Sequence, residues 1–186
     1  YQSMRLQLYS DYEAMDHDPI IAAALDIVSD EATTRNEYGD VLKVNSSNEN
    51  IRKVLHNLFY DVLNIEFNLA TWVRNMCKYG DMYLKLEVSE KFGVYNVIPL
   101  SVYEVVREEG TDPDNPSYTR FTMDPNGLAS GATNTIRRDQ FSLENYEVAH
   151  FRLLTDSNYL PYGRSYLEPS RKVFKQLMLM EDAMLI

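Results

Sequence analysis

The sequence has a single cysteine, Cys77, among its 186 residues. One thiol allows no disulfide within the chain, so a reducing compartment is expected. Cys77 lies in an apolar pattern with helical spacing. A buried structural thiol is therefore favoured over a catalytic nucleophile at this position.

Long apolar runs and basic residues are also scarce. No apolar run approaches the roughly 20 residues needed to cross a bilayer, so stable membrane insertion is not expected. The first residues, Tyr1–Leu6, contain no basic segment followed by an apolar one, and we expect no signal peptide there. Lys plus Arg number 18 against 28 Asp plus Glu, and the net charge is −10. Because nucleic-acid binders carry a basic patch, a chain of this charge is expected to repel phosphate.

Motifs for catalysis are absent from the sequence. Gly127 and Gly131 lack the spacing of a phosphate-binding loop, and no Gly-x-Ser-x-Gly sequence occurs. His17, His56 and His150 lie far apart with no metal-ligand spacing. We interpret them as two surface or capping residues and one strand residue. We predict no catalytic residue, no metal ligand and no cofactor, and the chain is predicted not to be an enzyme.

Charged clusters offer two weaker candidate sites. Asp26, Asp30 and Glu31 lie close together on one predicted helix, where carboxylates could serve a metal or acid/base site. Nothing else in the sequence converges on them, so a solvated or interface-lining acidic face is favoured. The basic clusters, Arg137-Arg138 and Arg164 with Arg171-Lys172, could contact phosphate. At this net charge, solubility or pairing with acids of a neighbouring subunit is favoured.

Helical spacing of apolar residues predicts four helices in the first 80 residues. Asp18-Pro19 is typical of an N-cap followed by proline in the first helical position. Ser47 or Asn48 can cap the third helix, and Gly80 is the expected C-terminal cap of the fourth. The expected helices carry the apolar sets Tyr1, Met4, Leu8, Tyr12, Met15; Ile20 to Val28, ending near Thr33; Ile51, Leu55, Leu58, Val62; and Leu69, Trp72, Val73, Met76.

Alternating apolar residues then predict a mostly antiparallel sheet. Met82–Val88 and Val94–Ile98 are expected to form a hairpin. The other expected strands are Val41–Val44, Val102–Glu108, Tyr118–Met123 and Glu147–Leu154, and Asp124–Thr133 is expected to be a loop. Helices first, then a sheet, then a long last helix is an α+β layout.

The last stretch, Tyr162–Ile186, is predicted to be a turn followed by a long helix. Ser165 and Glu168 match a capping box, but a start at Glu168 with Pro169 in the first helical position is favoured. Its last two turns are apolar nearly all round, which is typical of a helix buried on several sides. No stop signal follows, so the helix is predicted to continue beyond Ile186, in a chain that is an internal fragment of a longer protein.

Four segments, in order, resemble the portal vertex (head–tail connector) proteins of contractile-tailed bacteriophages, specifically the T-even-like and cyanophage-type family. They are Asp18–Ala32; Phe67–Tyr79 with Gly80-Asp81-Met82-Tyr83; Ile98-Pro99-Leu100 with Val105–Glu108; and His150-Phe151-Arg152 through Tyr162–Pro169 to Ala183.

This resemblance implies a structural subunit of a ring, a dodecamer in the family, at one vertex of the capsid. Such a ring passes double-stranded DNA during packaging and ejection, without sequence specificity. It contacts the major capsid protein, the terminase packaging motor and the neck and tail proteins. The implied location is the virion, after assembly in the host bacterial cytoplasm. Residues 1–161 would be the wing region and residues 162–186 the start of the stem helix.

Two other functions stay open from the residues alone. One is a non-catalytic adaptor module of another large assembly with the same helix-plus-sheet layout. The other, less favoured, is a metal-dependent enzyme that uses Asp26, Asp30 and Glu31.

Overall fold

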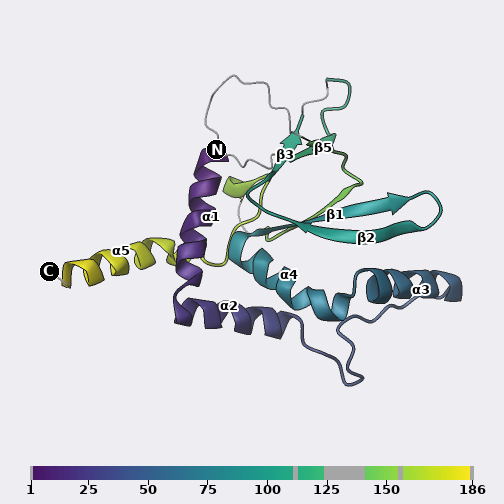
Figure 1. Cartoon of the computed structure of the whole chain (residues 1–186), viewed down its shortest axis with the longest axis horizontal. Coiled ribbons are helices and arrows are strands. Elements are labelled where there is room, and N and C mark those ends of the chain that lie inside the picture. Colours follow the sequence, from purple (N-terminus) through teal and green to yellow (C-terminus); the bar gives the residue numbers. More distant parts are fainter. Residues whose placement is uncertain (1, 111–112, 124–140, 155–156, 185–186) are drawn as a thin grey trace.

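The computed structural model describes residues 2–110, 113–123, 141–154 and 157–184. Within them lie five α-helices and two three-stranded antiparallel sheets, which confirms the α+β class (Figure 1). The helices are α1 (Gln2–Asp16), α2 (Pro19–Ala32), α3 (Glu49–His56), α4 (Ile65–Tyr79) and α5 (Glu168–Met184). A π-helical segment, Asn57–Val62, extends α3, and a short 3₁₀ turn spans Ser157–Tyr159.

The helix ends are fixed by the expected capping residues. The Asp18 carboxylate accepts hydrogen bonds from the backbone N–H groups of Ile20 and Ile21, with Pro19 as the first residue of α2. Asn48, rather than Ser47, caps α3 in the same way. Gly80 closes α4 with a φ of 86°, a conformation that costs glycine little because it has no Cβ.

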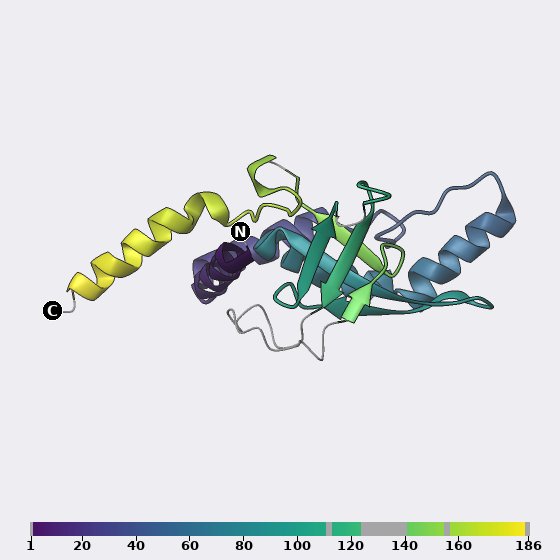
Figure 2. The same ribbon diagram turned by 90° about the horizontal axis from the view of Figure 1, so that it is seen from above.

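The first sheet has the strand order β2-β1-β6. β1 (Asp81–Ser89) and β2 (Gly93–Leu100) form the predicted hairpin, paired from Tyr83 with Leu100 to Ser89 with Gly93. β6 (Val148–Arg152) pairs antiparallel with the other edge of β1. This hairpin and α3 extend from one end of the molecule, and α5 extends from the other (Figures 1 and 2).

The second sheet has the order β3-β4-β5, formed by Val105–Glu109, Thr119–Met123 and Phe141–Leu143. The strand expected from Val102 begins only at Val105, because residues 101–104 form a turn closed by Glu104 N–H and the Ser101 carbonyl. β5 has three residues, too few for an alternating pattern, and was not predicted. The expected loop Asp124–Thr133 lies outside the described residues.

The strand predicted at Val41–Val44 is wrong. This stretch is irregular, and the carbonyl of Leu42 accepts a hydrogen bond from the Tyr60 hydroxyl instead of pairing with a strand. Within this stretch, Leu42 lines an apolar cavity described below.

The core lies between α1, α4 and the two sheets. Tyr12 and Met15 of α1 are buried as predicted, but Met4 is 62% exposed. The inward face of α1 is turned toward Arg5 and Tyr9, and Tyr9 packs edge-to-face against Tyr79 and Tyr103. The inward face of α1 therefore includes the charged Arg5 and the aromatic Tyr9 as well as Tyr12 and Met15.

Candidate functional site

The base of α5 is held by a backbone junction with α4 and the first sheet. The N–H of Leu153 donates to the carbonyl of Gly80 at 2.9 Å, and the N–H of Arg164 donates to the carbonyl of Leu153 at 3.0 Å. A Cβ on Gly163 would lie 1.9 Å from the Gly80 carbonyl oxygen. Only two glycines permit so close an approach of the two backbones.

Ser165 completes this junction at the C-terminal end of α4. Its hydroxyl lies 2.5 Å from the carbonyl oxygen of Lys78, to which it donates, and it accepts a hydrogen bond from the N–H of Leu167. Ser165 therefore serves α4 and the local turn, and the capping box with Glu168 is not formed. α5 begins at Glu168, the favoured start, with Pro169 as the next residue.

Asp81, 1% exposed, is the central side chain of the junction. Its carboxylate accepts hydrogen bonds from His150 Nε2 at 2.7 Å, the Gly163 N–H at 2.9 Å and the Tyr9 hydroxyl at 3.3 Å. These three donors come from β6, the segment before α5, and α1. One carboxylate thus connects the three parts of the chain that meet at the base of α5.

His150 is the histidine predicted to be a strand residue, and it lies in β6. It stacks on Tyr83 with ring centroids 4.3 Å apart. Burial lowers the pKa of His150, which outweighs the opposing effect of Asp81, and nearby Arg107 and Arg152 lower it further. The ring is therefore neutral, with the proton on Nε2 toward Asp81 and Nδ1 accepting from Arg107 at 3.2 Å.

Arg5 is a buried cation beside this carboxylate. It is 3% exposed, and its guanidinium lies 3.8 Å from the centre of the Tyr162 ring. One nitrogen donates to the carbonyls of Val105 and Val102. Arg5 thereby fastens α1 to the second sheet. We did not predict this junction from the sequence, because its members are separated by about 70 to 160 residues and form no motif.

Charged side chains hold the first turns of α5 against α1. Arg171 and Lys175 contact the Asp11 carboxylate at 2.9 and 2.6 Å, and the Tyr12 hydroxyl donates to Glu168 at 2.6 Å. Although burial acts in the opposite direction, the hydrogen bonds from Lys175 and Arg171 lower the pKa of Asp11. Within the predicted basic cluster, Arg171 thus pairs with the acids Asp11 and Glu168 of its own chain.

The remaining predicted residues are dispersed. Cys77 is buried, as predicted, and burial raises the pKa of its thiol. Asp26 pairs with Arg74, and the exposed Asp30 and Glu31 contact no metal-ligating partner within the described residues. His17, in the turn after α1, and His56, the last residue of α3, are both exposed. Arg137 and Arg138 lie outside the described residues.

An apolar cavity of about 280 Å³ lies between α4 and the first sheet. Its walls include Trp72, Met76, Leu84 and Phe151, and Leu42 closes one side. Its lining residues, all apolar, offer no acid, base or nucleophile. In the part of the chain that is described, no helix is long and apolar enough to cross a membrane.

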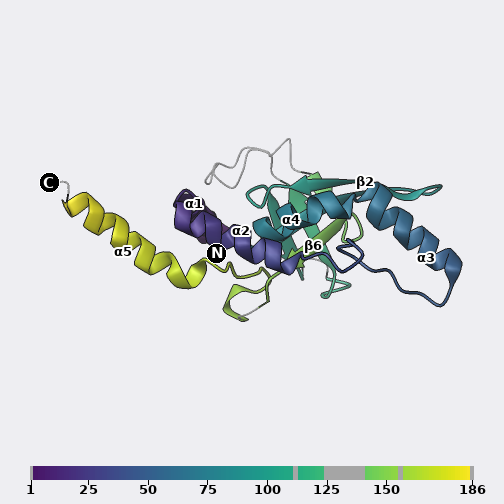
Figure 3. The same ribbon diagram turned by 90° about the horizontal axis from the view of Figure 1, so that it is seen from below.

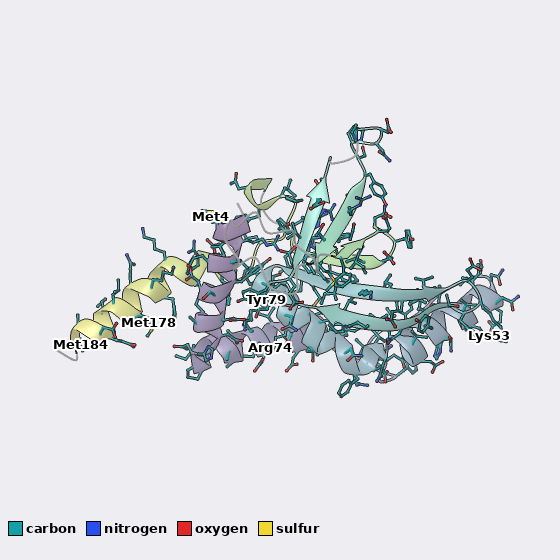
Figure 4. All side chains as sticks on the ribbon, turned by 45° about the horizontal axis from the view of Figure 1, so that its top comes forward. Met4, Lys53, Arg74, Tyr79, Met178 and Met184 are labelled. Carbon is teal, nitrogen blue, oxygen red and sulfur yellow. The ribbon has the colours of Figure 1, made fainter. Side chains whose placement is uncertain are left out.

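Beyond this junction, α5 leaves the body of the molecule (Figures 1 and 2). Its side chains Met178 and Met184 lie outside the rest of the fold in Figure 4. Exposed apolar residues on this helix are Val173, Leu177, Met178, Leu179, Met180 and Met184. Exposed apolar side chains gathered on one projecting helix mark a surface for interaction with another molecule or segment.

Comparison with known families shows the family to which this chain belongs. The model of the family described as bacteriophage T4-like portal protein (Gp20) matches residues 5–186. The chain therefore belongs to the T4-like portal protein family, a family of structural virion proteins. No match was found among curated proteins.

Proposed function

We propose that this chain is a subunit of a portal ring, the dodecamer of the family, at one vertex of a phage capsid. The ring would conduct double-stranded DNA during packaging and ejection, and would attach the terminase motor and the neck and tail proteins. Residues 1–161 would form the wing, seated in the major capsid protein, and residues 162–186 would begin the stem. Assembly would take place in the host bacterial cytoplasm.

The observation that carries the proposal is the family match over residues 5–186. The exposed side of α5 gives it a physical basis. Val173, Leu177 and Met180 are 65%, 46% and 63% exposed, and such a side is stable in water only when another surface covers it. A ring of head-to-tail subunits provides that surface at every position.

No catalytic group is needed for this function, because a separate motor supplies the energy of packaging. Of the three candidate acids, Asp26 is paired with Arg74, and the residues that line the apolar cavity are all apolar.

The test is the assembly state of the full-length protein. We expect closed rings in negative-stain images and a mass of many subunits by light scattering. A monodisperse monomer under all conditions of salt and concentration would contradict the proposal.

A further inference from the structure

Two unpartnered apolar stripes lie on different helices of this chain. On α5 the stripe is Val173, Leu177, Met180 and Met184, and the last of these is 84% exposed. On α2 it is Ile20, Ala24 and Ile27, followed by the acidic Glu31; Ile20 and Ile27 are 78% and 62% exposed. Both stripes have the spacing i, i+4, i+7, i+11, which places their members along one side of a helix.

The two stripes do not face each other within one copy. α2 lies on the underside of the molecule and runs from α1 toward α4, whereas α5 leaves α1 on the other side (Figure 3). The inward side of α2 is a different one, formed by the buried Leu25 and Ser29. Each stripe is therefore open to a second molecule.

The charges of the two helices match when they run antiparallel. α5 has Lys172 at its first turns and Glu181 and Asp182 near its end. α2 begins at an N-terminus already capped by the Asp18 carboxylate and finishes with the exposed Asp30 and Glu31, which make no ion pair with other described residues. Antiparallel packing places Lys172 near Asp30 and Glu31 and keeps Glu181 of α5 away from these two acids.

The same arrangement pairs the apolar positions one by one. Met184 meets Ile20, Met180 meets Ala24 and Leu177 meets Ile27, with Val173 beside Glu31. Alanine opposite methionine lets the helices approach closely while the long side chain fills the space. A parallel arrangement would bring the acids at the two C-terminal ends together.

We infer that the α5 stripe of one copy packs antiparallel on the α2 stripe of the next copy. The occupant of each surface is thus a second copy of this chain. Because the two surfaces differ, the contact is heterologous and can repeat around a ring. This inference rests on the proposed function and names the surfaces by which the ring would be joined.

Cysteine cross-linking in the full-length protein tests the pairing. The variant Ala24→Cys with Met180→Cys places two thiols at one predicted contact, and the native Cys77 is 2% exposed and does not compete. The matched control is Ala24→Cys with Asp182→Cys, because Asp182 lies on the opposite side of α5 from Met180. Mild oxidation should give a ladder of covalent multimers from the first variant only.

The outcomes separate this inference from the proposed function. Suppose that images show rings, but that neither variant gives a ladder or that both give the same ladder. This result would overturn the α2–α5 contact and leave the portal function standing. A protein that stays monomeric would overturn the portal function and the contact with it.

A charge exchange gives a second test that needs no oxidation. Glu31→Lys should weaken assembly about two- to fivefold per interface, as expected for one exposed ion pair. Adding Lys172→Glu should restore it. Loss without recovery in the double variant would contradict the antiparallel arrangement.

Discussion

At the scale of single residues, Asp81 has the largest consequence for the fold. It is a buried carboxylate whose three hydrogen-bond donors come from three distant parts of the chain. Because a buried donor without a partner costs about 1–3 kcal/mol, the effects of losing this one acceptor accumulate.

We predict that Asp81→Ala lowers the free energy of unfolding by about 3 kcal/mol or more, since His150, Gly163 and Tyr9 lose their acceptor together. Urea unfolding followed by circular dichroism measures it. Asp30→Ala on exposed α2 is the matched control and should change stability by less than about 0.5 kcal/mol. Equal effects of the two substitutions would contradict the role assigned to Asp81.

The burial of His150 predicts that the stability of the folded chain depends on pH. Burial lowers its pKa in the folded state, so the unfolded chain binds the proton first as the pH falls. The charged groups facing the ring are Asp81, Arg107 and Arg152. Stability should therefore be fully present above the unfolded pKa of about 6.5 and decline below it, levelling off once the folded pKa is passed.

The measurement is the free energy of unfolding between about pH 7.5 and 5.5. Asp11 and Asp16 do not titrate in this window, because hydrogen bonds outweigh the effect of burial and lower their pKa values in the folded state. His150→Gln has no proton to gain and should abolish the decline in this window. A decline of the same size in His150→Gln would show that another group causes it.

At the scale of elements, α5 is fastened to α1 by a compact charged group rather than by a broad apolar contact. Asp11 is the acceptor, with a side chain 10% exposed, and Arg171 and Lys175 are 29% and 49% exposed. Because the two cations are partly exposed, solvent reduces the stabilisation that these ion pairs give. The burial of Asp11 keeps part of that stabilisation.

We predict a coupling energy of about 0.5–1.5 kcal/mol between Asp11 and Arg171, since the two are in direct contact at 2.9 Å. A double-mutant cycle of Asp11→Ala and Arg171→Ala measures it by chemical unfolding. The same cycle with Lys172→Ala, an exposed neighbour on α5, is the control and should give no coupling. Coupling in the control alone would contradict the contact.

The sequence predicted the elements whose causes are local. Asp18-Pro19, Asn48 and Gly80 set helix ends through bonds to residues two to four positions away, and the hairpin of β1 and β2 follows from alternation across a short turn. Val41–Val44 had the residues of a strand but no neighbouring edge to pair with. Strand formation depends on that distant partner, which composition does not reveal.

The junction at the base of α5 escaped prediction for a related reason. Asp81, His150 and Gly163 are each ordinary in their local sequence, and Arg5 fell on a face expected to be apolar. Only the folded chain brings them together. The nearest signal was the pair of glycines, Gly80 and Gly163, and even they gave no hint that the two would touch.

At the scale of the whole molecule, the net charge of −10 bears on how a portal subunit meets DNA. Arg171 and Arg74, two of its cations, are already paired with acids of the same chain. Few counterions would then be released from DNA, so binding should be weak and independent of sequence.

We predict no nanomolar complex in a gel-shift assay at physiological salt, with either random or AT-rich duplexes of equal length. Any shift seen at low salt should disappear as the salt concentration rises. A tight complex with one sequence and not with the other would contradict the prediction.

The contact of Gly80 with Gly163 also restricts the angle at which α5 leaves the rest of the molecule. α5 has 17 residues and is about 25 Å long, so a tilt of about 5° at its base moves its tip by about 2 Å. In a closed ring such errors add from one subunit to the next, and a small tilt in every copy would open the circle into a spiral. Two backbones in contact leave little freedom for that tilt. In the proposed ring, the contact between Gly80 and Gly163 would limit this tilt in every subunit.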